Sequence, residues 1–590
     1  MDEHRIPPLR AGRRAAGAAL LGWLGDARAP RLCRVTGSPG SGRTHLLAWL
    51  VAGGTDPAAP PGRRVNAYLP AEGCGVRAAV WQLARQLEVS ARTPGELLDR
   101  LAADPRPTVL CVPELDRAAD PARLVAELLD PLLGLPHLRL VVEATADLVF
   151  TAVAEPAELD LDDPRWTDRA RWDAWCGREG HDPAGYPNPG RALGTALAPP
   201  PGPAELLARA PRTATGAPDL PAAGPELLTG LWAAAARSGD LGPLAADPLL
   251  YVLAEPVAVT TALEAAAPGT APAALDAAWR AAGPALVDTP EPAVRAHQLR
   301  TRLLGTEPAD PAAALAADRL AAAPGRWSAR WARRGPAPAA TAPGAGPLRG
   351  RWLLADPTGA VHVLSPADGA VLGRIAVPGP KPLRALAATP GGSLVLLDAW
   401  GGTELLTPGP TGPGLEPYAL DEALARLAAA VHGEALVLAA SPDLPDAAPA
   451  LGDSGGGVHW YRPGGGVLGE RLHTGPVTAL AVGTAAPGVP LLASGGLDGA
   501  VRLWGPGSAP MPEPADHRPC PVTALALDAG PDGPVLAVAW ADGLLRVRRP
   551  QRPDGALDLR LGSPATGLSL AGGVLLAGLD DGPVALDLRD

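Results

Sequence analysis

The sequence predicts a multidomain protein with an α/β domain, a helical region and a C-terminal β-propeller. Three observations support this fold class. Residues 37–44 read GSPGSGRT, a glycine-rich loop between a short apolar strand and a helix. Apolar residues recur at helical spacing over residues 226–335. From residue 350 onward, short strands and glycine-containing turns recur at intervals of roughly 40–55 residues, the length of a propeller blade.

Length and composition fit several folded domains. The chain has 590 residues, and one hydrophobic core rarely serves more than about 250–300. Although 71 residues are glycine and 72 are proline, 47% are hydrophobic and 15 are tryptophan, which is enough to fill cores. The net charge of −11, without a long basic cluster, argues against nucleic acid and against an acidic membrane surface as partners.

The cysteines and the hydropathy pattern indicate a cytoplasmic location. The five cysteines are far apart and show neither zinc-site nor disulfide spacing, so we expect reduced thiols. No apolar run reaches the length of about 18 residues that suggests a membrane-spanning helix. The isolated histidines have no ligand-spaced partners, and no nucleophile motif indicates a catalytic triad.

The glycine-rich loop predicts a phosphate-binding site. It follows the strand at 31–36 and precedes a helix at 44–54. This arrangement directs backbone N–H groups and a helix N-terminus toward phosphate oxygens. The predicted cofactor is ATP or ADP with Mg²⁺, which the Thr44 hydroxyl would bind. The residues assigned to nucleotide binding are Gly37, Ser38, Pro39, Gly40, Ser41, Gly42, Arg43 and Thr44.

Two further strands complete the expected α/β domain at 1–155. The segment PTVLCVPELDRA at 107–118 reads as a buried strand that runs into acidic residues, and LRLVVEA at 138–144 reads as another strand. Helical spacing between them predicts a doubly wound parallel sheet. Glu114 and Asp116 are the candidate acids for Mg²⁺ or catalysis, although neither is assigned as a confident catalytic residue.

Over residues 5–330 the chain resembles the STAND and NACHT type of signal-transduction NTPase, within the AAA+ grouping. The family's second motif has four apolar residues followed by Asp, any residue, Leu, Asp, Glu and Ala. Here VLCV is the apolar strand, and Leu115, Asp116 and Ala118 match. Pro113 replaces the first Asp, and Arg117 replaces the Glu. The resemblance therefore implies a nucleotide-dependent switch in which part of the hydrolytic machinery is changed.

Other departures from the family affect the same chemistry. Arg43 stands where the phosphate loop has lysine; it keeps the charge, but its planar guanidinium is not equivalent to a compact ammonium. Glu143 and Ala144 stand where the family has a γ-phosphate-sensing segment. Each lost group costs roughly 2–4 kcal/mol of transition-state stabilisation by analogy with oxyanion donors. Three alternatives remain open: nucleotide binding without fast turnover, an active ATPase switch, and a scaffold that binds no nucleotide.

The middle of the chain reads as connecting segment and helices. Residues 156–225 are rich in Pro and Ala and contain a Trp-rich helix, whose Trp166, Trp172 and Trp175 fit either core packing or a partner-binding patch. Residues 226–335 predict a helical arm, and 336–349 predict a linker.

The propeller is predicted over 350–590. Six units are visible, with a seventh open, and their turns contain Gly359, Gly402, Gly457, Gly499, Gly543 and Gly582. The best unit, 473–505, resembles the WD-repeat family, whose buried hydrogen-bonded set is matched by His473, Ser494, Asp498 and Trp504. A propeller offers a rigid surface to other proteins, so we expect a signalling or scaffold protein with a protein partner, and homo-oligomerisation stays open.

Overall fold

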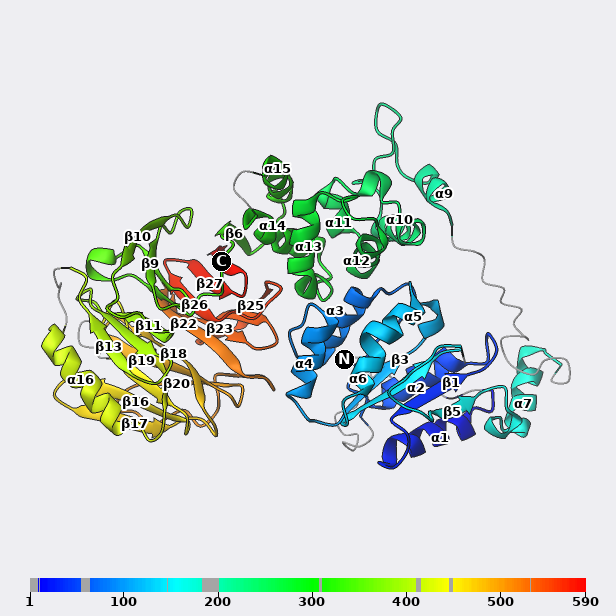
Figure 1. Cartoon of the computed structure of the whole chain (residues 1–590), viewed down its shortest axis with the longest axis horizontal. Helices are drawn as coiled ribbons and strands as arrows, with labels where there is room; N and C mark the ends of the chain where they lie inside the picture. Colours follow the sequence, from blue (N-terminus) through cyan, green and yellow to red (C-terminus); the bar gives the residue numbers. More distant parts are fainter. Residues whose placement is uncertain are drawn as a thin grey trace. The chain divides into compact units, whose positions relative to one another are not determined.

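The structure is a computed structural model that describes residues 9, 11–54, 64–145, 147–182, 201–306, 310–409, 415–444, 449–530 and 532–589 (Figure 1). It divides into two compact units, Met1–Pro272 and Ala273–Asp590. The first contains a parallel sheet and helices, and the second contains a β-propeller and three further helices. The predicted multidomain combination of α/β, helical and propeller parts is confirmed.

The first unit is built on a five-stranded parallel sheet with the order β2-β3-β4-β1-β5. The strand β1 lies between β4, which supplies Leu140 opposite Leu32, and β5, which supplies Leu159 opposite Val35. The carboxyl ends of all five strands therefore meet at one edge of the sheet. The bounds are β1 Leu32–Thr36, β2 Ala67–Tyr68, β3 Thr108–Val112, β4 Leu138–Glu143 and β5 Ala157–Asp160.

Helices cover this sheet on both faces. The chain crosses from β1 to β2 in one direction and returns through β3 to β4, so right-handed connections place their helices on opposite faces. Leu20, Leu46 and Leu50 of the first two helices pack against Val35 and Val141 in one apolar core. The helices are α1 Arg14–Gly25, α2 Arg43–Gly54, α3 Val76–Gln86, α4 Pro94–Ala102, η2 Leu115–Arg117, α5 Pro121–Leu124, η3 Val125–Leu129 and α6 Asp130–Leu133.

Further helices complete the first unit. In α7 the indoles of Trp172 and Trp175 are buried and stacked with their centroids 5.3 Å apart, while Trp166 packs against the core of α1 and α2. Helix α12 contacts α3, where Thr261 accepts a hydrogen bond from the Gly75 amide. The connecting segment at 183–200 lies outside the described residues. The bounds are η4 Pro164–Trp166, α7 Arg169–Glu179, α9 Pro203–Ala208, α10 Pro225–Ser238, η5 Gly242–Leu244, α11 Pro248–Leu253 and α12 Pro256–Ala265.

The second unit is a six-bladed propeller, so the alternative of seven blades is not needed. Each of its six antiparallel sheets starts at the inner strand and runs outward. The first three sheets contain β7 Ala340–Pro343, β8 Trp352–Ala355, β9 Val361–Leu364 and β10 Val371–Ile375; β11 Leu383–Ala388, β12 Leu394–Asp398 and β13 Thr403–Leu406; and β14 Ala435–Ala439, β15 Ala450–Asp453, β16 Gly457–Arg462 and β17 Gly466–Arg471. The helix α16 Pro417–Ala430 precedes β14 and contacts β13 and β16.

The last three sheets have the same antiparallel pattern. They contain β18 Val477–Ala486, β19 Val489–Gly496, β20 Ala500–Trp504 and β21 Asp516–His517; β22 Val522–Gly530, β23 Gly533–Trp540, β24 Leu544–Arg549 and β25 Arg552–Arg560; and β26 Gly567–Ala571, β27 Val574–Leu579, β28 Gly582–Leu588 and β6 Trp327–Ala332. The final sheet thus takes its outer strand, β6, from the opposite end of the propeller sequence. This pairing closes the ring and leaves no open first or last blade.

The propeller begins before the boundary predicted from the sequence. Strand β6 lies in the segment assigned to the helical arm, and β7 and the short helix η6 Gly346–Leu348 lie in the segment assigned to the linker. Helix α14 belongs with the propeller: Arg302 is buried, pairs with Asp581 at 2.5 Å and also donates to the Leu561 carbonyl. The predicted helical arm is divided, because α10–α12 lie in the first unit while α13 Ala273–Leu286, α14 Pro292–Leu304 and α15 Pro311–Leu320 lie in the second.

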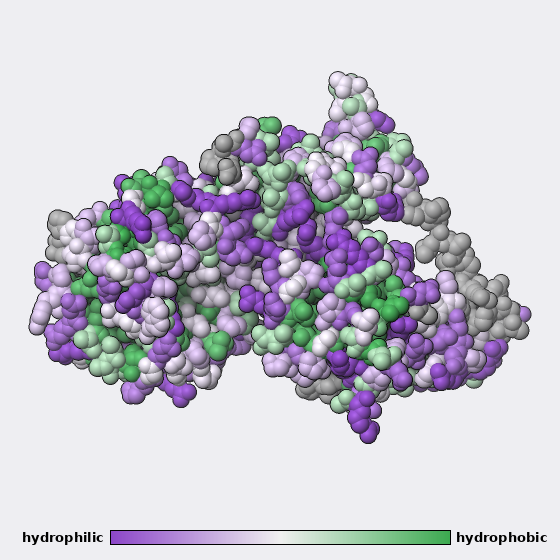
Figure 2. Space-filling model, viewed as in Figure 1, coloured by the Kyte–Doolittle hydropathy of each residue, from purple (hydrophilic) through white to green (hydrophobic). Residues whose placement is uncertain are grey.

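On the face shown in Figure 2, hydrophilic and hydrophobic residues are interspersed. None of the described helices combines the length and apolar character needed to cross a bilayer.

Candidate functional site

The glycine-rich loop occupies the carboxyl edge of the sheet between β1 and α2. Gly37, Gly40 and Gly42 all have positive φ angles, at 136°, 79° and 95°. At Gly37 a Cβ atom would lie 2.7 Å from the Ser41 hydroxyl oxygen, so a larger residue would clash. The glycines therefore permit the tight turn that the sequence predicted at this position.

A carboxylate from the next strand binds the loop. Asp162 follows β5, and its side chain accepts hydrogen bonds from the Ser38 amide at 2.6 Å and from the Ser38 hydroxyl at 2.9 Å. Charge-assisted hydrogen bonds of this kind are among the stronger ones in proteins. An acidic side chain of the chain itself thus bonds to a backbone N–H that the motif would direct toward phosphate.

A buried arginine fixes the other side of the loop. Arg13, which immediately precedes α1, donates to the Ser41 carbonyl at 2.8 Å and to the Leu161 carbonyl at 2.7 Å. Burial lowers the pKa of Arg13, while the nearby Asp162 and Asp160 act to raise it. These contacts join α1, the loop and the segment after β5.

Arg43 and Thr44 both contact Glu143, the last residue of β4. The Arg43 Nε atom lies 3.3 Å from one carboxylate oxygen, and the Thr44 hydroxyl donates to the other at 2.9 Å. Glu143 is only 3% exposed. Burial raises the pKa of its carboxyl, although the Thr44 hydrogen bond and the Arg43 charge oppose that rise.

Asp116 is the second acid beside Arg43. It lies in η2, and one of its oxygens is 3.5 Å from the Arg43 guanidinium. Its other oxygen, Oδ1, is buried and has no hydrogen-bond partner among the described residues. That oxygen is the feature of the site that best fits a water of a Mg²⁺–nucleotide complex.

Glu114, the other candidate acid, is directed elsewhere. It has a left-handed backbone with φ of 54°, and its side chain pairs with Arg117 at 2.9 Å. Pro113 occupies the first position after β3, where the resembled family has an aspartate, and it supplies no ligand atom. Within the described part of the chain, no three or more His, Cys, Asp or Glu side chains form a metal-binding group.

Sequence reasoning did not find Asp162 or the role of Glu143. Glu143 was noted only as a departure from the family's sensing segment, and Asp162 was not singled out. The available signal was topological: Glu143 ends β4 and Asp162 follows β5, the two strands that flank β1, and the carboxyl ends of parallel strands meet at one edge of the sheet.

His473, Ser494 and Asp498 of the propeller form one hydrogen-bonded network. The His473 ring forms hydrogen bonds with the Asp498 carboxylate at 3.0 Å and with the Ser494 hydroxyl at 2.9 Å. Trp504 is not part of this network, because its indole N–H donates to the Ser508 carbonyl at 3.1 Å. The network ties the segment before β18 to β19 and to the turn before β20.

An aspartate begins the same turn in several blades. Their carboxylates accept backbone N–H bonds from residues two or four positions later, at Asp356, Asp398, Asp453, Asp498 and Asp542. Burial acts to raise the pKa of Asp356, but hydrogen bonds from Thr358, His362 and backbone amides prevail and lower it to about 2. These residues stabilise the turns and are structural.

No family model matches the chain, and no curated protein matches it. Among solved structures, 1246 chains match. One, described as the structure of U3-55K, is 15% identical, with a TM-score of 0.30, and the match covers 44% of this chain and 98% of that one.

Proposed function

We propose that this protein is an interaction scaffold whose propeller binds a protein partner and whose α/β domain binds ADP or ATP without fast turnover. The propeller supports the first part, because rigid blades with variable loops mostly serve protein recognition. The second part depends on the position of Arg43. Its guanidinium lies between Glu143 and Asp116 at the N-terminus of α2, beside a loop with the backbone shape of an anion site.

The absence of fast turnover follows from the acids around the loop. Hydrolysis of a nucleotide depends on placing charges and an attacking water with high accuracy. Among the described residues, Glu114 is paired with Arg117, Glu143 is bound to Arg43 and Thr44, and Asp116 faces Arg43. Each of these three carboxylates therefore lies beside an arginine. The positive charge makes the carboxylate a weaker base toward an attacking water.

Calorimetric titration of the whole protein with ATP and ADP, with and without Mg²⁺, tests this proposal. Arg43→Ala and Thr44→Val should both weaken binding, while Arg28→Ala, which removes a fully solvated arginine of the same unit, should not. Steady turnover that is lost in Asp116→Asn would instead indicate an active ATPase.

A nucleotide-independent scaffold is the second candidate. The Asp162 carboxylate on the Ser38 amide favours it, because an anion of the chain already occupies that donor. Absence of binding to wild-type protein and to Asp162→Asn would support this candidate.

A further inference from the structure

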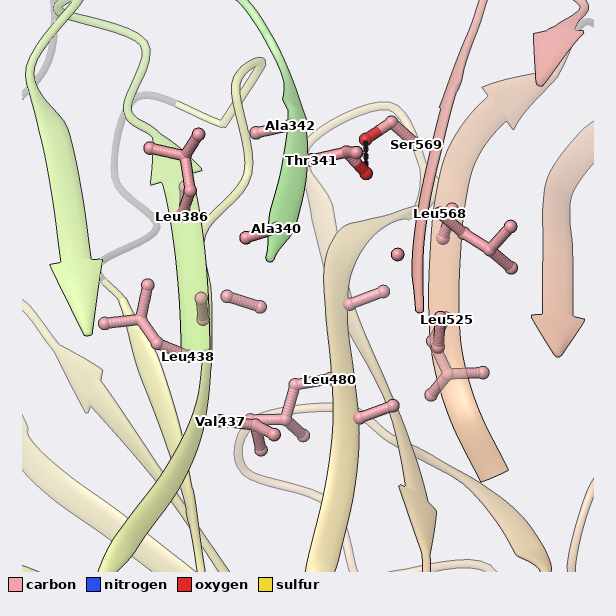
Figure 3. A pocket seen from close by; sticks show the side chains of 18 of the residues that line it. Ala340, Thr341, Ala342, Leu386, Val437, Leu438, Leu480, Leu525, Leu568 and Ser569 are labelled. Carbon is pink, nitrogen blue, oxygen red and sulfur yellow. Dashed lines mark hydrogen bonds between the residues drawn. The ribbon is translucent and has the colours of Figure 1, made fainter. Parts of the chain in front are cut away.

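The central channel of the propeller widens at one end into a pocket. The channel is lined by residues of the inner strands, from alanine to leucine in size, and Figure 3 shows the hydrogen bond between Thr341 and Ser569 beside it. Its volume is about 140 Å³. At the end where the inner strands finish, the adjoining pocket has a volume of about 310 Å³.

Asp528, one of the two acidic residues that line this mouth pocket, lies beside apolar walls. Asp528 of β22 is half-buried and accepts hydrogen bonds from the Gly572 amide at 3.0 Å and from the Ala529 amide at 2.9 Å. Within the described ranges of the chain, no cation pairs with it. A half-buried carboxylate without a counter-charge is costly, so the pocket favours a cation beside it.

The walls suit an aliphatic stem. Val482, Leu527, Leu570 and Val574 line the pocket together with Trp352, which is almost fully buried. The Trp352 indole N–H has no acceptor among the residues that the structure describes. The pocket thus combines apolar walls with an unused donor and an unpaired acid.

Two arginines lie at the rim, and neither forms an ion pair with Asp528. Arg349 lines the rim and pairs with Asp443 at 2.9 Å, with both side chains mostly exposed. Arg351 is also at the rim and is exposed to solvent. Burial raises the pKa of Asp528; the hydrogen bonds from the Gly572 and Ala529 amides oppose that rise, and Asp443 adds to it.

We propose that this mouth pocket binds a lysine or arginine side chain from an extended segment of a protein partner. The cation pairs with Asp528, and the aliphatic stem packs on the apolar walls, as such side chains do when only their charged end needs a polar partner. The volume is at the lower limit for small-ligand pockets, which suits one side chain. This inference rests on the proposed role of the propeller in protein binding.

Model peptides test the proposal on the full chain. Acetyl-Gly-Lys-Gly-amide and its arginine analogue are titrated by calorimetry, with norleucine and glutamate analogues as controls. Both basic peptides should bind, and neither control should. Asp528→Asn should weaken binding about tenfold or more, the effect of losing a hydrogen bond to a charged group.

Two further variants separate recognition from folding. Asp528→Glu keeps the charge and should retain part of the binding. Asp532→Asn makes the same change nearby, at a residue that does not line the pocket, and should bind like wild type. Equal binding to Asp528→Asn and wild type, absence of binding by both basic peptides, or preference for the glutamate peptide would overturn the proposal.

Failure of this inference is distinguishable from failure of the scaffold role. Protein partners that crosslink equally to wild type and to Asp528→Asn would leave the scaffold role intact and contradict the pocket. Absence of any crosslinked partner, together with absence of peptide binding, would contradict both.

Discussion

At the scale of single residues, the glycine-rich loop is distinguished by the acids that surround it. Asp162 accepts two hydrogen bonds from Ser38, and Glu143 binds both Arg43 and Thr44. Any phosphate that enters must compete with these carboxylates for the same donors. The chain's own acids therefore set the affinity of the loop for anions.

Asp162→Asn should raise the affinity for ADP. The amide keeps an acceptor for Ser38 but removes a negative charge from the loop. We therefore expect a dissociation constant about tenfold lower, which corresponds to the free energy of one hydrogen bond to a charged group. Calorimetry measures it. Asp163→Asn is the matched control, since Asp163 caps η4 through Arg165 and does not contact the loop. Equal affinities in the two variants would contradict the prediction.

Removing Arg43 should destabilise the sheet by leaving Glu143 buried without its cation. We expect Arg43→Ala to lower the local free energy of unfolding by about 3 kcal/mol, as for a broken buried ion pair. Adding Glu143→Gln should recover most of the loss, because the uncompensated charge disappears. Hydrogen exchange of the peptides covering β1 and β4 measures both changes. A double variant as unstable as the single one would show that the pair is not coupled.

His473 should make the propeller less stable in mild acid. Burial lowers its pKa below the ordinary 6.5, although Asp498 opposes that shift. The unfolded chain then binds the proton first, so stability is complete above about pH 6.5 and falls as the pH decreases below it, by at most about 1.4 kcal/mol per pH unit. Pulse proteolysis in urea at several pH values measures this slope.

His473→Gln should reduce the slope but not abolish it, because burial also lowers the pKa of His297 in the same unit. His517→Gln, a change at an exposed histidine of the propeller, should leave the slope unchanged. A wild-type slope retained in the His473 variant would exclude His473 as its source.

The sequence predicts local features of the site better than its long-range contacts. The glycines and Arg43 form one contiguous motif, and their positions in the structure follow from it. Asp162 reaches Ser38 across 124 residues and Glu143 reaches Thr44 across 99. Such contacts depend on the order of the strands in the sheet. Neither secondary-structure propensity nor the spacing of motifs along the chain specifies that order directly.

At the scale of elements, strand β6 shows how a boundary was misplaced. Its residues WSARWA alternate between buried and less buried positions, the period of a strand with one packed face. The helical pattern before β6 and the proline-rich sequence after it instead predict a helical arm up to residue 335 and a linker beyond it. The blade repeat is visible in the sequence only where its turns contain glycine. Strand β6 has no such turn to a neighbouring strand, because it pairs with β28 from the opposite end of the propeller.

Trp327→Ala in β6 should destabilise the propeller by about 3–5 kcal/mol, the cost of truncating a fully packed tryptophan. The side chain is 2% exposed, belongs to the core of the closing blade, and contacts His297 with ring centroids 5.4 Å apart. Pulse proteolysis in urea measures the change.

Trp400→Ala serves as the matched control, because Trp400 is 69% exposed on the second blade and its loss should cost less than about 0.5 kcal/mol. Equal effects of the two substitutions would contradict the prediction that Trp327 is a main packing residue of the closing blade.

At the scale of the whole molecule, the helices and blades do not divide as the sequence pattern suggests. Helices with similar composition belong to different compact units, α10–α12 to the first and α13–α15 to the second. Helical periodicity predicts that a segment is helical, but it does not identify the surface against which the apolar face packs. The contacts of α14 with the last two blades make that assignment: Gln298 donates to the Arg560 carbonyl of β25 at 3.2 Å, and Arg302 pairs with Asp581 between β27 and β28.

These contacts predict where the propeller can be separated from the rest of the chain. A fragment of residues 273–590 keeps α14, β6 and β7, so its ring is closed, and it should unfold in one cooperative thermal transition. A fragment of residues 350–590 begins at the boundary that the repeats alone suggest. It lacks the inner strand of the first blade and the outer strand of the last, which leaves β8 and β28 with unpaired edges. We expect this shorter fragment to aggregate or to melt without a cooperative transition, as measured by circular dichroism and light scattering. Comparable cooperative melting of the two fragments would mean that the blades are stable without ring closure. It would also mean that β6 and α14 contribute little to the stability of the propeller.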